Sequence, residues 1–350
     1  MPLKTSLVSA ILAAAALTAA CGAQTPSAAQ PAKALPAADA QSRKAVDAAN
    51  AFLATLSETQ KKQVMFAFDD KAQRARWTNL PQGMEVTRRG VSRGEMNAAQ
   101  KAALNTLLAA ILSPQGMRMV DEQMAADDVL KSEGGPLPFG NDKYWVSFLG
   151  APSTTSPWIL QFGGHHLGLN IAVVGPNISL SPSLTGGQPL KFMKEGKPVY
   201  IVEREVSAAN ALMASLTPAQ KAKVVLGPRK IDLVLGPGHD GQKLQPEGLP
   251  ASEMTEAQKA LLFSLIEARM DILNADDLAV TLAPVKASLN QTWFAWYGPT
   301  SADRAYFRVT NPKMILEFSP QDLGGDDTNH VHNMYRDPTN EYGAGWAPIS

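Results

Sequence analysis

The sequence predicts an α+β fold of two tandem pseudo-symmetric repeats, each with helices followed by a three-stranded antiparallel meander, plus a C-terminal extension. Three observations support this prediction. Apolar residues recur at helical spacing behind typical helix caps, and short aromatic and β-branched segments lie between Gly/Pro-rich turns. Several short sequences also occur twice in the same order. With 350 residues and 45% hydrophobic content, the chain can bury a substantial core.

The N-terminus is organised like an export signal. Lys4 precedes an uncharged, mostly apolar stretch at 7–20, which is too short to span a bilayer but suits a signal peptide. The sequence Leu17-Thr18-Ala19-Ala20-Cys21 resembles a bacterial lipobox, whose cysteine is acylated and becomes the mature N-terminus. We therefore expect a signal peptide at 1–20, a lipidated Cys21, and a flexible tether at 21–42 that is rich in Ala, Pro, Gln and Ser.

A membrane is the partner that this lipid anchor implies. The protein would face the periplasm, and Gly22 favours the outer over the inner membrane if the source is Gram-negative. Thr18 is less usual in a lipobox, so a soluble periplasmic or secreted protein is the alternative. Cys21 is the single cysteine, which leaves no thiol for a disulfide, a cysteine nucleophile or a thiolate metal site. Lys+Arg and Asp+Glu are equal at 32 each, so nucleic acid is not an expected partner.

Three pairs of matching sequences indicate an internal duplication. Segment 48–57 (AANAFLATLS) recurs at 208–217 as AANALMASLT. In the second match, Glu95-Met96 and 99–102 (AQKA) recur as Glu253-Met254 and 257–260 (AQKA). In the third, Trp145 and Gly150 correspond to Trp293 and Gly298. We accordingly expect a first repeat at 43–175, a Gly-, Pro- and Ser-rich linker at 176–204, a second repeat at 205–319, and the extension at 320–350.

The helices of each repeat are predicted from their caps. The first helix ends near Leu56 or Leu216, and the second begins directly afterwards at a capping box, a hydroxyl residue followed three positions later by glutamine. The two capping boxes are Ser57–Gln60 and Thr217–Gln220, and the third helices are expected at 97–112 and 255–273. Leu104, Leu107, Leu108 and Ile111 fit one buried face of the third helix.

Three short strands follow the helices of each repeat. Aromatic and β-branched residues between Gly/Pro breaks predict them. The expected ranges are about 143–149, 158–162 and 167–174 in the first repeat, and about 292–297, 305–310 and 314–318 in the second.

Four of the five histidines lie in two clusters that are distant in the sequence, Gly164-His165-His166 and Asn329-His330-Val331-His332. Imidazole is a common metal ligand and the usual general base near neutral pH. If His165 and His166 begin a strand, they face opposite ways, and His166 shares its face with small or polar residues. His166 is then the better pocket residue and His165 a packed neighbour or additional ligand. His330 and His332 share one face if extended.

Glu317 and Arg336 are the candidate catalytic residues. Glu317 lies between apolar residues in a predicted strand, where a carboxylate either faces solvent or is drawn inward by a cation or by Arg336. Arg336 would pair with Glu317 or orient an anionic substrate. Three imidazoles with one carboxylate suit a divalent metal, Zn, Cu or non-haem Fe. The fifth histidine, His239, lies in a Gly-rich turn and is expected to be exposed.

These motifs together resemble a bacterial exported family known as domain of unknown function 3500. The resemblance covers about 45–343 and is most specific in the C-terminal extension. It is carried by Trp158, Gly164-His165-His166-Leu167, Phe307-Arg308, Glu317-Phe318, Asn329-His330-Val331-His332, Arg336-Asp337-Pro338 and Asn340-Glu341-Tyr342-Gly343. The family transfers no activity. It implies the architecture, the importance of both histidine clusters, and Gln161 as a further neighbour of the site.

The preferred hypothesis is an exported, lipid-anchored protein with one metal site between its repeats. His166, His330 and His332 are the expected ligands, and an open coordination position would support metal-assisted hydrolysis or redox chemistry on an unknown small molecule. Two alternatives stay open. One is a non-catalytic periplasmic or surface protein that binds a small ligand or metal, and the other is a metal-free enzyme that uses histidine as acid and base.

Overall fold

The structure is a computed structural model that describes residues 35–84, 87–134, 136–323 and 326–347. The predicted signal peptide, Cys21 and most of the predicted tether therefore lie outside the described residues. The end of that tether does not stay extended, because Asp39 caps a helix that begins at Ala40. Across the described ranges, no helix is both long and apolar enough to cross a membrane.

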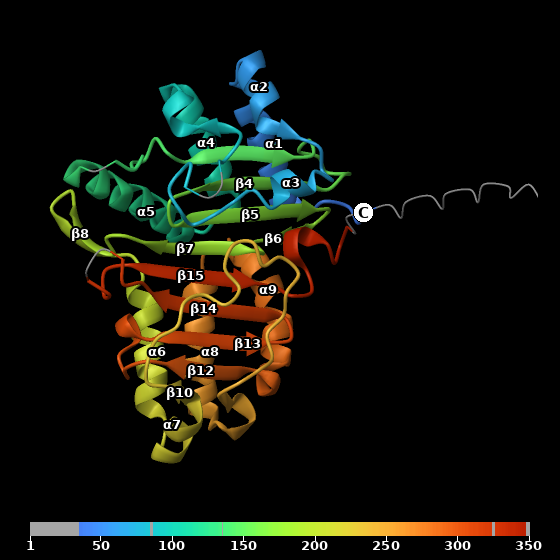
Figure 1. Ribbon diagram of the computed structural model, residues 1–350. Helices are drawn as coiled ribbons and strands as arrows, with labels where there is room; N and C mark the ends of the chain where they lie inside the picture. Colours follow the sequence, from blue (N-terminus) through green and yellow to red (C-terminus); the bar gives the residue numbers. More distant parts are fainter. Residues whose placement is uncertain (1–34, 85–86, 135, 324–325, 348–350) are drawn as a thin grey trace, which may run out of the picture. The chain divides into compact units, whose positions relative to one another are not determined.

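A mixed, mostly antiparallel sheet carries the fold. The main strand order is β1-β3-β4-β5-β7-β15-β14-β13-β12-β10, and only the outer pairs β1–β3 and β10–β12 are parallel within it (Figure 1). Its strands are β1 (Met65–Phe66), β2 (Val91–Ser92), β3 (Trp145–Leu149), β4 (Trp158–Gly164), β5 (Leu167–Val174), β6 (Asn177–Ser179), β7 (Ser183–Gly187), β10 (Val225–Gly227), β11 (Leu249–Pro250), β12 (Trp293–Tyr297), β13 (Tyr306–Asn311), β14 (Met314–Pro320) and β15 (Val331–Arg336). A separate hairpin consists of β8 (Lys191–Lys194) and β9 (Lys197–Tyr200).

The helices begin where their caps predict. Ser57 and Thr217 form complete capping boxes with Gln60 and Gln220. The helices are α1 (Ala40–Ala54), α2 (Glu58–Val64), α3 (Lys71–Arg74), α4 (Ala98–Ile111), α5 (Pro114–Glu133), α6 (Glu203–Ser215), α7 (Pro218–Val224), α8 (Glu256–Met270) and α9 (Ala275–Ala287). Short 3-10 turns are η1 (Arg93–Glu95), η2 (Ala251–Glu253), η3 (Leu289–Gln291), η4 (Ala302–Arg304) and η5 (Glu341–Gly343). The α+β class is confirmed, although α5 and α9 were not predicted.

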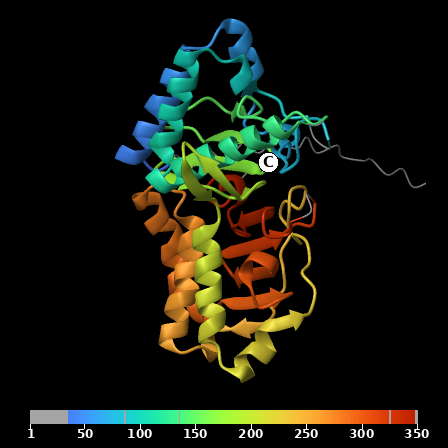
Figure 2. The same ribbon diagram turned by 90° about the vertical axis from the view of Figure 1, so that its left-hand side faces the viewer.

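Alternate residues along the strands give the sheet an apolar and a polar face. Leu160 and Phe162 belong to the core that includes the helices, whereas Gln161 between them bonds to polar side chains on the opposite face. The long segments 67–84 and 228–248 cross that second face. Figure 2 shows the helices along one side of the strands and the yellow segment 228–248 on the other.

The expected linker and C-terminal extension both contribute strands to the middle of the sheet. Within 176–204, β7 pairs with β5 on one side and with β15 on the other. Within 320–350, β15 lies between β7 and β14, in the middle of the sheet. The sequence of β7, Ser-Leu-Thr-Gly-Gly, is typical of a loop, but its small residues allow close packing. A Cβ on Gly186 would lie 2.0 Å from the Val331 carbonyl oxygen.

A buried arginine joins a helix to the seam, which is the pair of strands β7 and β15. Arg269 of α8 is 2% exposed and donates to the Ser183 carbonyl and hydroxyl oxygens in β7, both at 3.1 Å. It also reaches the Asn333 carbonyl of β15 at 3.4 Å. Burial lowers the pKa of Arg269 to about 10, so the guanidinium stays charged at neutral pH. Arg269 thus bridges the two strands that come from the expected linker and extension.

We predict that Arg269→Met lowers the free energy of unfolding by about 2–4 kcal/mol, because buried oxygens at the seam lose their donors. Chemical denaturation monitored by circular dichroism measures the change. Arg204→Met is the control, since Arg204 makes a 2.7 Å ion pair with Asp271 on the surface and should contribute less than about 1 kcal/mol. Equal losses in the two variants would contradict the bridging role.

Candidate metal centre

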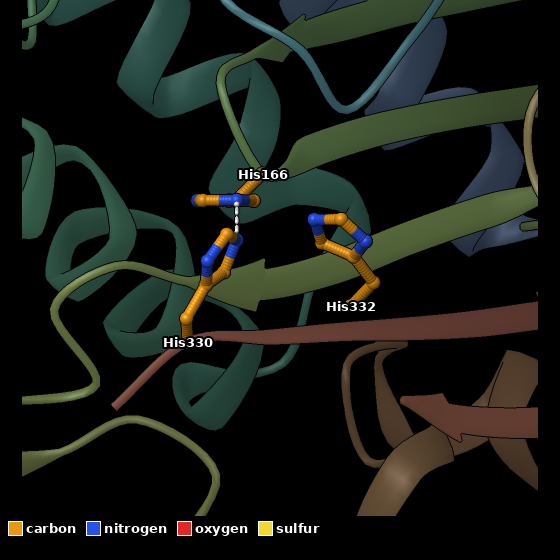
Figure 3. Close-up of side chains that lie close together, drawn as sticks. All are labelled: His166, His330 and His332. Atoms are coloured by element: carbon orange, nitrogen blue, oxygen red, sulfur yellow. Dashed lines mark hydrogen bonds between the residues drawn. The ribbon is translucent and has the colours of Figure 1, made fainter. Parts of the chain in front are cut away.

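The fold brings the two histidine clusters together at one end of the seam. His165 and His166 form the turn between β4 and β5, while His330 directly precedes β15 and His332 lies within it. Because β5 and β15 both pair with β7, the turn lies beside the start of β15. Figure 3 shows the rings of His166, His330 and His332 directed toward one another.

The prediction that His165 and His166 begin a strand is wrong. His165 and His166 form a hairpin turn and do not begin a strand, so strand alternation does not separate them. His166 has a φ of 57°, a left-handed conformation that is uncommon for residues other than glycine. Such strained positions concentrate at functional sites. The turn directs His166, rather than His165, into the group of three.

The spacing of the three imidazoles is suitable for a single metal ion. One ring nitrogen from each of His166, His330 and His332 lies within 4.8 Å of the other two, and all three residues are buried. The His166 and His330 Nε2 atoms are 2.9 Å apart. Zinc–nitrogen bonds of roughly 2.0–2.1 Å in a tetrahedral site place ligand nitrogens about 3.4 Å apart. Small ring rotations would therefore convert the observed geometry into a three-histidine set.

Neighbouring groups orient two of these rings. The His330 Nδ1 atom lies 2.7 Å from the Leu323 carbonyl oxygen, which can only accept, so Nδ1 carries the proton and Nε2 presents a lone pair. The Asn79 side-chain amide approaches the His332 Nε2 at 3.0 Å, and the Asn79 carbonyl accepts from the His166 backbone N–H at 2.9 Å. Asn79 thereby connects both parts of the site.

His165 contacts the His166 ring but is not one of the three converging imidazoles. Its ring lies against that of His166, tilted by 34° with centroids 3.7 Å apart, and its Nδ1 lies 2.6 Å from the Asp127 carboxylate in α5. His165 is not part of the group of three ligand atoms within 4.8 Å. The arrangement thus places His165 as a neighbour that fixes the His166 ring, which was one of the two roles expected from the sequence.

Burial makes the three imidazoles electrically neutral. Burial lowers the pKa of His330 to about 4 and that of His332 to about 3. It also lowers the pKa of His166 well below its usual value, and the neighbouring imidazoles lower it further. Protons therefore do not compete with a metal for the ring nitrogens at neutral pH. The same low pKa values make these residues poor general bases there, since the best catalytic pKa lies near the working pH.

All five histidines of the chain line one cavity of about 380 Å³. The apolar residues that line it are Leu80, Pro81, Met84, Leu137, Phe139, Leu233, Pro237 and Leu323. Besides the histidines, its polar lining residues are Asn79, Gln188, Asp232 and Gln321, and Gly236 completes the lining. His239 is half-buried at this cavity, although its Gly-rich turn was expected to be exposed. The sequence offered one indication that His239 lies near the other four histidines, namely that the chain contains so few histidines.

Glu317 and Arg336 lie on the same face of the sheet but do not pair with each other in the structure. The Glu317 carboxylate accepts from the Val234 and Leu235 backbone N–H groups at 2.7 and 2.8 Å. Arg336 donates to the Leu235 and Gly236 carbonyl oxygens, each at 2.8 Å. Both charged side chains therefore hold segment 234–236 in place, and residues in and beside this segment line the cavity. Neither Glu317 nor Arg336 lines the cavity itself.

The remaining contacts of this region are also structural. Arg336 forms ion pairs with Asp240, at 3.2 Å, and with Glu341. Tyr306 donates to Glu317 at 2.7 Å. Gln161 donates to Asn170 at 2.9 Å and lines a different cavity, so the structure does not place it beside the histidines.

A family model described as protein of unknown function (DUF3500) matches residues 38–344. The chain belongs to the DUF3500 family. This confirms the resemblance inferred from the sequence. Comparison with curated proteins and with solved structures found no match.

We predict that Asp127→Ala lowers the free energy of unfolding by about 2–4 kcal/mol, because both His165 Nδ1 and the Gly140 N–H lose a buried acceptor. Urea denaturation measures the change. Asp121→Ala in the same helix is the control, since Asp121 is exposed and pairs only with Lys194 at the surface. A loss below about 1 kcal/mol for Asp127→Ala would show that the carboxylate does not hold His165.

Proposed function

We propose that this protein binds one divalent metal ion through His166, His330 and His332 and uses it for metal-assisted hydrolysis or redox chemistry. The observation that carries the proposal is the convergence of three buried, neutral imidazoles within 4.8 Å at the wall of a cavity. Histidine ligands suit Zn, Cu and non-haem Fe. A bound ion would supply Lewis acidity to a water or a substrate oxygen.

An open coordination position favours a catalytic role over storage. Structural zinc sites use four protein ligands, whereas catalytic sites commonly keep three and leave one position for water or substrate. Here three imidazoles converge, and all three line the cavity. Metal-free acid–base catalysis is the weaker alternative, because the pKa values of His330 and His332 are about 4 and 3.

The test is the metal content of the purified protein, measured by mass spectrometry after dialysis against zinc, copper or iron. We expect the natural protein to hold about one equivalent of metal. For His332→Ala we expect a metal affinity that is lower by at least about 100-fold, because one of three ligands is lost. His239→Ala is the matched control, because His239 lines the same cavity outside the group of three and should leave affinity unchanged. Failure of the natural protein to retain any of these metals would reject the proposal.

We also propose that the protein is exported and anchored by a lipid on Cys21, facing the periplasm. The proposal is supported by the short apolar stretch at 7–20 and the lipobox-like sequence that ends in the chain's single cysteine. We predict that cells incorporate labelled palmitate into the protein and that Cys21→Ser abolishes both the label and its recovery in the membrane fraction. Labelling that survives in Cys21→Ser would contradict the anchor.

We further propose that the two repeats of helices and three-stranded meanders arose by duplication. Equivalent glutamines make equivalent bonds: Gln100 donates to Gln60 and to the Thr55 carbonyl, and Gln258 donates to Gln220 and to the Ser215 carbonyl. Each of these four distances is 2.9 or 3.0 Å. The candidate metal site would then be an asymmetric addition to this scaffold, since β15 follows both meanders.

A further inference from the structure

We propose that the cavity beside the three imidazoles binds a small molecule with one metal-coordinating oxygen group and an uncharged, apolar body. This inference rests on the proposed metal site and adds the chemical class of its ligand. It follows from the lining of the cavity, its charge and its size.

The rim of the cavity exposes large apolar side chains. Met84, Leu137 and Leu323 are 52%, 39% and 75% exposed and line the cavity. They make up half of the six large hydrophobic residues found to be this exposed in the described part of the chain. Exposed apolar groups that gather at one concave site typically mark a binding surface. Phe139 and Leu233 continue the apolar wall inward and are half-buried.

The charge of the lining limits what the body of the ligand can be. No lysine or arginine lines the cavity among the described residues, and Asp232 is the single carboxylate there. Gln321 and Ser319 donate to Asp232 at 2.9 and 3.3 Å and hold it in place. A negatively charged body would meet this carboxylate and no cation. The metal is therefore the place for an anionic or oxygen-donor group, and the rest of the ligand carries no negative charge. The apolar walls of the cavity favour an uncharged body there.

The size of the cavity indicates a small molecule. Its volume of about 380 Å³ falls within the range of roughly 300–1,000 Å³ that is typical of small-molecule sites. Such sites combine a mostly apolar lining with a few polar groups that fix orientation. Here Asn79 is such a polar group, because its side-chain amide lies 3.0 Å from the His332 Nε2 atom.

Three hydroxamates that share one metal-binding group test this inference by isothermal titration calorimetry on the metal-loaded protein. Octanohydroxamate should bind at least about 50-fold more tightly than acetohydroxamate, because each fully buried methylene strengthens binding roughly fourfold. Suberic monohydroxamate, which has the same length and a terminal carboxylate, should bind about 10-fold more weakly than octanohydroxamate, because its charge lacks a cationic partner.

A rim variant locates the apolar part of the ligand. Leu137→Asp should weaken octanohydroxamate about 10-fold and leave acetohydroxamate and metal content unchanged, because Leu137 lies at the rim and not at the imidazoles. Met193→Asp is the matched control. Met193 is 63% exposed in the β8–β9 hairpin, does not line the cavity, and should leave both affinities unchanged.

The outcomes separate the two proposals. Equal affinities for acetohydroxamate and octanohydroxamate in a protein that retains metal would overturn the apolar ligand and leave the metal site standing. Equal affinities for octanohydroxamate and suberic monohydroxamate would overturn the uncharged body. If the protein retains no metal and binds neither hydroxamate, the metal site is wrong and this inference is wrong with it.

Discussion

The backbone ladder between β7 and β15 is the contact on which both the sheet and the candidate site depend. It joins β3, β4 and β5, through β7, to β14, β13 and β12, through β15. His332 pairs with Gly186 across this ladder, and the register therefore fixes where the histidines of β15 lie relative to the β4–β5 turn. A shift by one residue would turn His332 to the helix-covered face and separate the three imidazoles. Gly186 makes the ladder possible, because a side chain there would meet the Val331 carbonyl.

Two opposite charges stabilise the cavity wall without taking part in its lining. Glu317 and Arg336 lie on neighbouring strands, and each uses backbone groups of segment 234–236 as hydrogen-bond partners. A buried charge is tolerated when its hydrogen-bonding capacity is used, and here the backbone and nearby side chains use it. The residues nominated from the sequence as catalytic thus position Asp232, Leu233 and Pro237 around the site.

Sequence reasoning predicted those features that depend on local chemistry. Ser, Thr or Asn caps followed three residues later by glutamine placed α2, α4, α7 and α8, and aromatic or β-branched runs placed β3–β5 and β12–β14 within a few residues. It missed β7, because Ser-Leu-Thr-Gly-Gly has no strand periodicity, and it missed the partners of Glu317 and Arg336. Partners and strand order depend on tertiary contacts, which a single sequence does not display. His166 lies in the group of three imidazoles, but its turn conformation contradicts the strand argument that favoured it.

The central position of β15 also determines the order in which the chain can fold. Both neighbours of the strand at 331–336 precede it in the sequence, so synthesis delivers β7 and β14 before the strand that pairs with them. Until it arrives, the inner edges of β7 and β14 lack the partner that separates them in the native sheet. Unpaired strand edges invite aggregation. A chain truncated before residue 331 should therefore accumulate as an aggregate, and cells that make this protein must protect two open edges until β15 has been made.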